Sequence, residues 1–322
     1  MKKEFIGKTL VLLGDSITQH GYYTYNLRSY FQGKEEKCYI YNRGTGGNRA
    51  VMAPYILDDE IRELKPDYVF ISFGANDIGI WLYDGRKVVS DKLLEERKKR
   101  DDEYFNSYAK IIDELKLRGI KPIVVSPFAM DELLFEKDDI ETVADNDEKA
   151  NNIDANFYTK KTYRNINQAL KFYAQTLKAL AQEKGALYVP MFEKTYEKML
   201  VTRGLFNDDG LHYSHGEGHA LLAKIFLEFL GCEDIPDTFA KTPENDQLEQ
   251  LVQDERYAGF IMRASPYNPM FGEFTEEQID EAAKKRIEDG IEWHRVVGEC
   301  YFKYKGKMDE LREEIKLRTE KL

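Results

Sequence analysis

The stretch TLVLLGDS, residues 9–16, decides the fold of the first part of this chain. Its apolar run, Leu10 to Leu13, is typical of a short buried strand that ends at Gly14. Ser16 therefore follows the carboxyl end of that strand. Because ligands bind at this edge of open α/β sheets, the sequence predicts a functional serine there.

More segments of strand length follow along the chain, and helical patterns separate them. An apolar stripe predicts a helix near 162–183, and another helix is expected near 215–230. Strands that alternate with helices predict an α/β domain built on one parallel sheet. The further expected strands lie at about 38–42, 67–73, 120–126 and 185–189.

Two of these strands lead into glycine-containing turns, NRGTGGN at 42–48 and GAND at 74–77. Both turns are expected on the same sheet edge as Ser16. Acyl transfer needs N–H donors where the oxyanion forms, and the Gly47 backbone, the Asn76 side chain and the Ser16 backbone would supply three of them.

Asp209 and His212 lie close to 200 residues after Ser16, in the sequence DGLH. A serine hydroxyl needs a base within hydrogen-bond reach, and the base needs a partner that fixes its tautomer. Three residues of separation allow the Asp209 carboxylate to fold back onto the His212 ring. Residues 207–209 could instead cap a helix, so this pair is informative only together with Ser16.

Together, GDS at 14–16, the turn at Gly47, GAND and DGLH resemble the four sequence blocks of the SGNH (GDSL-like) hydrolase family of esterases and lipases, over roughly residues 5–231. The resemblance implies Ser16 as nucleophile, Asp209 and His212 as its triad partners, and Ser16, Gly47 and Asn76 as oxyanion-hole donors. It also implies a three-layer α/β/α flavodoxin-like fold with a five-stranded parallel sheet in the order 2-1-3-4-5, and no metal or organic cofactor. Ile17 stands where the name-giving motif has Leu, which affects packing behind the serine.

The expected reaction is hydrolysis of a small-molecule ester that carries a short acyl group, preferably acetyl, on a carbohydrate alcohol. Lysophospholipids and thioesters are alternative substrates on the same fold. Aromatic residues near the serine edge, Tyr22, Trp81 and Tyr83, are candidates for substrate binding. The long connections 79–101 and 128–161 are candidates for lids or are solvated excursions.

Two other classes of function are alternatives to the esterase. The run HYSHGEGH, residues 212–219, would suit a metal-dependent hydrolase that uses His212, His215 and His219. Gly216 and Gly218 would loosen such a ligand set, and His-Glu-x-x-His is absent. A non-catalytic carbohydrate-binding module would have no use for a base paired to a serine.

Composition limits the partners. The 322 residues carry 47 basic and 58 acidic side chains, a formal net charge of -11, which disfavours nucleic acid and anionic membranes. The sequence shows neither an apolar segment long enough to span a bilayer nor a secretory signal. Three widely spaced cysteines, Cys38, Cys232 and Cys300, make a disulfide framework improbable, so a cytoplasmic location is expected.

The chain is predicted to divide into a hydrolase domain, residues 1–231, and a helical C-terminal extension, residues 232–322. From Trp293 to Ile315, apolar residues at three-and-four spacing predict one amphipathic helix. Such a helix buries its stripe either against its own chain or against a second copy, which would make a homodimer through the C-terminal helices. Both alternatives stay open at this point.

Overall fold

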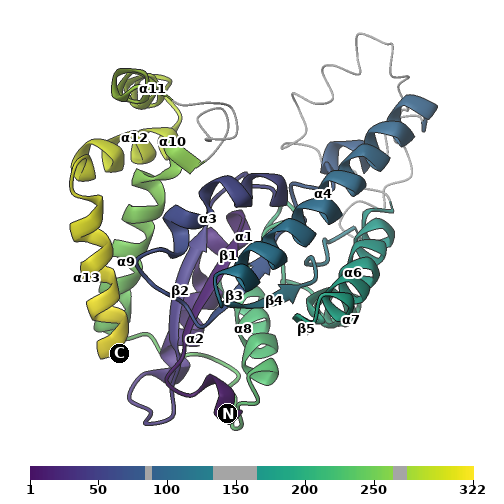
Figure 1. Cartoon of the computed structure of the whole chain (residues 1–322), viewed down its shortest axis with the longest axis horizontal. Helices are drawn as coiled ribbons and strands as arrows, with labels where there is room; N and C mark the ends of the chain where they lie inside the picture. Colours follow the sequence, from purple (N-terminus) through teal and green to yellow (C-terminus); the bar gives the residue numbers. More distant parts are fainter. Residues whose placement is uncertain (84–88, 133–164, 264–273) are drawn as a thin grey trace.

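The computed structural model describes residues 1–83, 89–132, 165–263 and 274–322. A five-stranded parallel sheet lies at the centre (Figure 1), in the order β2-β1-β3-β4-β5. This confirms the predicted α/β class and strand order. The strands are β1 (Thr9–Gly14), β2 (Tyr39–Gly44), β3 (Tyr68–Ser72), β4 (Lys121–Val125) and β5 (Leu187–Val189).

The register of the strands aligns the ends that carry the sequence motifs. Gly14 at the end of β1 pairs with Gly44 of β2 and with Ser72 of β3. A Cβ atom at Gly14 would clash with the Ser72 carbonyl and with the Thr18 side chain. The absence of a side chain at Gly14 therefore lets the short helix α1 (Ser16–Gln19) sit directly on the strand ends.

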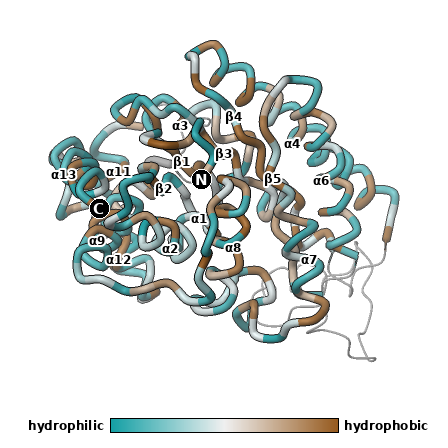
Figure 2. The backbone as a smooth tube through the Cα atoms, turned by 90° about the horizontal axis from the view of Figure 1, so that it is seen from below, coloured by the Kyte–Doolittle hydropathy of each residue, from teal (hydrophilic) through white to brown (hydrophobic). Residues whose placement is uncertain are grey.

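Helices cover both faces of the sheet and complete three layers (Figure 2). One layer holds α2 (Tyr22–Phe31) and α8 (Glu217–Phe229), which pack on each other. The other holds α3 (Ala53–Ile61), α4 (Asp91–Leu117) and α6 (Ile166–Glu183). Because the central strands are buried on both sides, β1 reads as an uninterrupted apolar run. The remaining elements of this part are α7 (Met191–Val201) and the 3₁₀ helices η1 (Lys3–Phe5), η2 (Ala50–Met52) and η3 (Ile80–Tyr83).

The C-terminal extension lies beside β2, at the edge of the sheet (Figure 1). Helices α9 and α13 contact this edge strand, and α11 and α12 stack farther out. The helices of the extension have apolar clusters of their own, whereas Cys232, Ile235 and Phe239, which precede them, pack with the core around the sheet. These helices are α9 (Pro243–Ala258), α10 (Phe260–Arg263), α11 (Glu276–Glu288), α12 (Glu292–Tyr304) and α13 (Met308–Lys321).

The prediction of one helix from Trp293 to Ile315 is wrong. Gly306, at a φ of +73°, ends α12, and α13 starts two residues later. The two halves of the stripe then bury in different places. Val297 packs in the cluster that includes Ile279, whereas Leu311 and Ile315 pack with α9.

A buried network of ion pairs joins the extension to the sheet domain. Arg256 of α9 contacts Glu60 of α3 at 2.8 Å, and Glu255 contacts Arg43 of β2 at 3.1 Å. Arg312 of α13 binds Glu255 at 3.0 Å. All five side chains are buried, and buried charges are tolerated only when they are paired in this way.

No described helix has both the length and the apolar character needed to cross a membrane. Cys38, Cys232 and Cys300 are buried free thiols.

Candidate active site

Ser16, His212 and Asp209 form one hydrogen-bonded chain. Ser16 is the first residue of α1, where Asp15 caps the helix by accepting the Ile17 amide at 3.0 Å. Ser16 Oγ lies 2.9 Å from His212 Nε2. His212 Nδ1 lies 2.5 Å from Asp209 Oδ2. A nucleophile, a base and a group that orients the base are thus within hydrogen-bond reach of one another.

The turn that carries Asp209 and His212 is folded by the same carboxylate. Asp209 Oδ1 accepts the backbone amides of Leu211 at 2.9 Å and His212 at 2.7 Å, while Oδ2 holds the imidazole. Helix α8 begins only at Glu217, after Gly216. The helix-cap alternative for residues 207–209 is therefore wrong, because these residues form a separate turn.

The two glycine-containing turns lie beside the serine, as the strand register requires. A Cβ atom at Gly46 would come 3.9 Å from the Ser16 Cβ, and the exposed Gly47 follows at a φ of +76°. Asn76 Nδ2 donates one hydrogen bond to the Asn48 carbonyl at 3.0 Å. Since a side-chain amide has two N–H groups, this bond positions Asn76 and leaves a second hydrogen for another acceptor.

Two buried carboxyl groups support these turns, and sequence reasoning assigned neither of them a role. Asp77 accepts the Ala50 amide at 2.7 Å, which ties the turn after β3 to η2. Burial raises the pKa of Asp77 to about 7, and that of Asp15 to about 6. Both residues were visible inside the motifs, but their burial was not.

The three aromatic candidates for substrate binding have different surroundings. The exposed Tyr22 stacks on His215, with ring centroids 3.8 Å apart. Trp81 and Tyr83 lie in η3, where Arg100 and Arg97 of α4 cover their rings at 4.4 and 4.0 Å. The structure thus packs both aromatics against α4, where Tyr83 is buried and Trp81 is partly buried.

The candidate lid at 79–101 is made of η3 and the first turns of α4, apart from residues 84–88, which lie outside the described residues. Most of the second candidate, 128–161, also lies outside the described part of the chain.

The histidines proposed as metal ligands have other contacts. His212 binds Ser16 and Asp209, and His215 stacks on Tyr22. His219 is buried, its ring centroid is 6.2 Å from that of His215, and burial lowers its pKa to about 3. Within the described ranges, no group of three or more His, Cys, Asp or Glu side chains is placed to hold a metal ion.

Two adjoining hollows lie at this site. The smaller, about 110 Å³, is lined by Ile17, His212 and Tyr213 among others. The larger, about 870 Å³, opens toward α9 of the extension. His20 and His215 line both.

Comparison with known proteins agrees with the sequence motifs. The sequence profile of the GDSL-like lipase/acylhydrolase family matches residues 12–221. A search of curated proteins gave no match.

Two solved structures resemble the fold at low sequence identity. A gut microbial diltiazem-metabolizing enzyme aligns with a TM-score of 0.72 and 14% identity, over 100% of this chain and 95% of that one. An acetylxylan esterase from Geobacillus stearothermophilus aligns with a TM-score of 0.51 and 21% identity, over 72% of this chain and 99% of that one. The first alignment therefore includes the region of the C-terminal extension.

Proposed function

This chain belongs to the GDSL-like lipase/acylhydrolase family and is a hydrolase, and we propose that it cleaves its ester with Ser16 as nucleophile, His212 as general base and Asp209 as the group that orients the base. The observation that carries this assignment is the continuous chain of contacts from Ser16 Oγ through His212 to Asp209, at 2.9 and 2.5 Å.

The reaction has two halves. Ser16 Oγ attacks the ester carbonyl carbon while its proton passes to His212 Nε2, and the carbonyl oxygen becomes an oxyanion. Backbone N–H groups of Ser16 and Gly47 and the second amide hydrogen of Asn76 bind this oxyanion. As the intermediate collapses, the alcohol leaves with the proton from His212, and the acyl group stays on Ser16. Water then attacks the acyl-enzyme by the same steps, with His212 again as base, and releases the acid.

The proposed substrate is a short-chain ester, preferably an acetyl ester, of a carbohydrate alcohol. Two observations support this choice. The hollow beside His212 is small, and a protein of similar fold is an acetylxylan esterase. Lysophospholipids and thioesters remain the alternative substrates of this proposal.

Three further assignments stand as proposals. We place the domain boundary between residues 231 and 232. Helices α9 to α13 have apolar clusters of their own, which supports a separate extension, whereas Cys232, Ile235 and Phe239 still pack with the core around the sheet. A cytoplasmic location is inferred from the cysteines, and a homodimer through the C-terminal helices from the apolar stripe on α12.

Hydrolysis of p-nitrophenyl esters of rising chain length tests the proposed activity. The wild type should hydrolyse the acetyl ester faster than esters of longer acyl chains. Ser16→Ala should lose at least about a thousandfold in kcat, because only the oxyanion hole and substrate binding then contribute to catalysis. Turnover by Ser16→Ala at the wild-type rate would refute the assignment of the nucleophile, and a preference for long acyl chains would refute the short-chain substrate.

A further inference from the structure

We propose that the C-terminal extension completes the active site by forming a subsite for the leaving alcohol, and that this alcohol is a neutral, polyhydroxylated group such as a sugar. The subsite is the larger hollow, of about 870 Å³, between α2, the start of α8 and helix α9. The inference rests on the proposed esterase function, because it identifies what the alcohol side of that ester contacts.

This cavity adjoins the hollow that His212 lines. The cavity shares His20 and His215 with the small hollow that contains His212. The His20 ring stands edge-on to the His212 ring, with centroids 5.3 Å apart. In the proposed reaction, His212 delivers its proton to the departing alcohol. A large cavity next to this base is therefore where the rest of the alcohol would lie.

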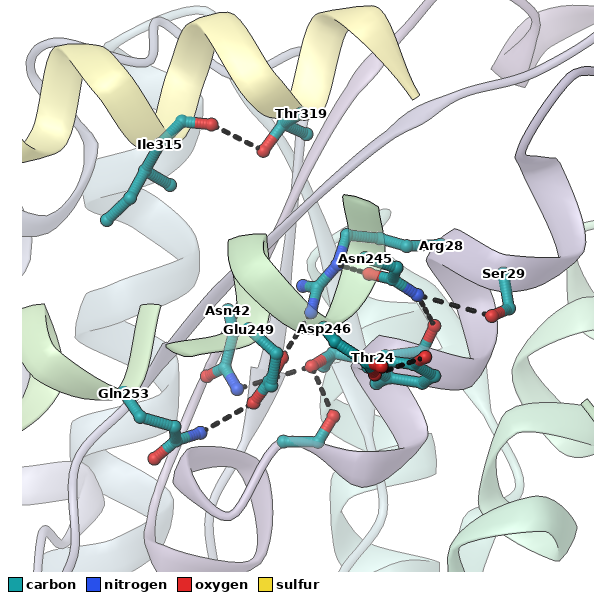
Figure 3. Close-up of polar contacts among 12 residues, drawn as sticks. Thr24, Arg28, Ser29, Asn42, Asn245, Asp246, Glu249, Gln253, Ile315 and Thr319 are labelled. Carbon is teal, nitrogen blue, oxygen red and sulfur yellow. Dashed lines mark hydrogen bonds and ion pairs between the residues drawn. The ribbon is translucent and has the colours of Figure 1, made fainter. Parts of the chain in front are cut away.

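Helix α9 is held in a fixed position relative to the serine. Gln253 Nε2 donates to the Gln19 carbonyl, in the helix that begins with Ser16, and to Glu249 Oε1, both at 2.7 Å. Asn245 accepts from Arg28 Nε at 3.0 Å and donates to the Ser29 hydroxyl at 3.2 Å. Figure 3 shows the contacts of Asn245 with Arg28 and Ser29, which link α9 to α2. The wall that the extension supplies is thus anchored to the same short segment that carries Ser16.

The charges around the cavity favour a neutral occupant. Four carboxylates line it, but Glu249 pairs with Arg28, Asp237 pairs with Lys224, and Asp246 accepts the Tyr25 hydroxyl. The ammonium of Lys241, also in the lining, offsets part of the remaining charge. A strongly anionic wall would suit an ammonium group, whereas partly compensated carboxylates mainly offer hydrogen-bond acceptors.

The rest of the lining combines aromatic rings with side-chain amides. Tyr22 and Tyr257 stand on opposite elements, α2 and α9, and Gln250 and Gln253 lie along the α9 side. Hydroxyl groups need donors and acceptors of this kind, and the C–H faces of a sugar ring can pack on aromatic rings. The volume lies within the range of about 300–1,000 Å³ that small-molecule sites occupy, and it far exceeds what a simple alkyl alcohol needs.

Filling the cavity from α9 tests the proposal without altering Ser16, His212 or Asp209. Gln250 lines the cavity and is exposed. In Gln250→Trp, the larger indole side chain would therefore fill part of the alcohol subsite. Gln247 is also exposed and lies on the same helix, but it contacts Arg318 and does not line the cavity. Gln247→Trp is therefore the matched control. For each protein, kcat/KM is measured with mono-acetylated xylobiose, acetylcholine and ethyl acetate, and the melting temperature is recorded.

The wild type should prefer acetylated xylobiose to both other esters. In Gln250→Trp, the ratio of kcat/KM for acetylated xylobiose to that for ethyl acetate should fall by at least about tenfold, the scale on which a changed pocket discriminates between substrates. The same ratio should stay near the wild-type value in Gln247→Trp.

Three results would overturn the inference: an unchanged ratio in Gln250→Trp, an equal fall in both variants, or a wild-type preference for acetylcholine. Failure of the proposed function would look different. In that case the wild type would hydrolyse none of the three esters, and Ser16 would not react with a fluorophosphonate.

Discussion

The side-chain amide of Asn76 can donate two hydrogen bonds. One hydrogen binds the Asn48 carbonyl, and the other is proposed to bind the oxyanion. Loss of one oxyanion-hole donor costs about 2.7 to 4 kcal/mol of transition-state stabilisation, so Asn76→Ala should lower kcat by roughly 100- to 1,000-fold with little change in KM. Steady-state kinetics on a p-nitrophenyl acetate series measures both constants. If KM rose instead while kcat held, Asn76 would be a residue that binds the ground-state substrate.

The buried carboxyl group of Asp77 should make the stability of the folded protein depend on pH. Its pKa rises from 3.8 to about 7 on folding, mainly through burial, so the folded protein holds this proton more tightly than the unfolded chain. This tighter proton binding stabilises the folded protein below about pH 4, and the stabilisation is lost as the pH rises toward 7. The wild type should therefore lose more stability than Asp77→Asn between pH 5 and about 8, as measured by melting temperature. Parallel pH profiles for the two proteins would show that Asp77 does not titrate in this range.

The structure brings together Ser16, Asp209 and His212, which the sequence had singled out as one candidate site. Ser16, Asp209 and His212 sit in short motifs whose order and spacing indicate their chemistry, and parallel strands bring distant motifs to one edge. Trp81 and Tyr83 were harder to place, because they follow a strand at the correct edge but are covered by arginines from α4. A linear sequence does not show which side chain covers an aromatic ring.

Helix α9 is held by ion pairs with distant parts of the chain. Arg256 is fully buried and contacts Glu60 and Glu255. Removing one partner of a buried ion pair costs about 3–5 kcal/mol, whereas an exposed i,i+4 pair contributes only about 0.3–0.5 kcal/mol. Urea denaturation should therefore show a large loss of stability for Arg256→Ala and almost none for Lys98→Ala, which breaks the exposed pair with Asp102. Similar losses in the two variants would mean that the buried network does not anchor the extension.

The helices of the extension show where sequence patterns stop being sufficient. Apolar spacing runs from Trp293 to Ile315 without a visible break, because Tyr304 and Met308 are four residues apart even though a turn separates them. The one indication of that turn in the sequence is Gly306, since a glycine in the left-handed conformation commonly ends a helix. The ion pairs from Arg43 and Glu60 to α9 join residues about 200 positions apart, and no local pattern predicts them.

At the scale of the whole molecule, the apolar stripe of α12 is only partly covered. Trp293 remains 48% exposed although it meets the Phe260 ring, with centroids 5.5 Å apart. If the C-terminal helices form a homodimer, light scattering should give a dimer mass for the wild type and a monomer mass for Trp293→Asp. A wild-type monomer at high concentration would refute the dimer.

If Ser16 forms the covalent acyl-enzyme, a fluorophosphonate should label it, and peptide mapping would locate the label. We expect the label on Ser16 and none on Ser16→Ala. In His212→Ala the label should attach much more slowly, because the hydroxyl loses its base. Treatment with EDTA should leave the labelling of the wild type unchanged. A label on another residue, or labelling of Ser16→Ala at the wild-type rate, would show that Ser16 is not the nucleophile.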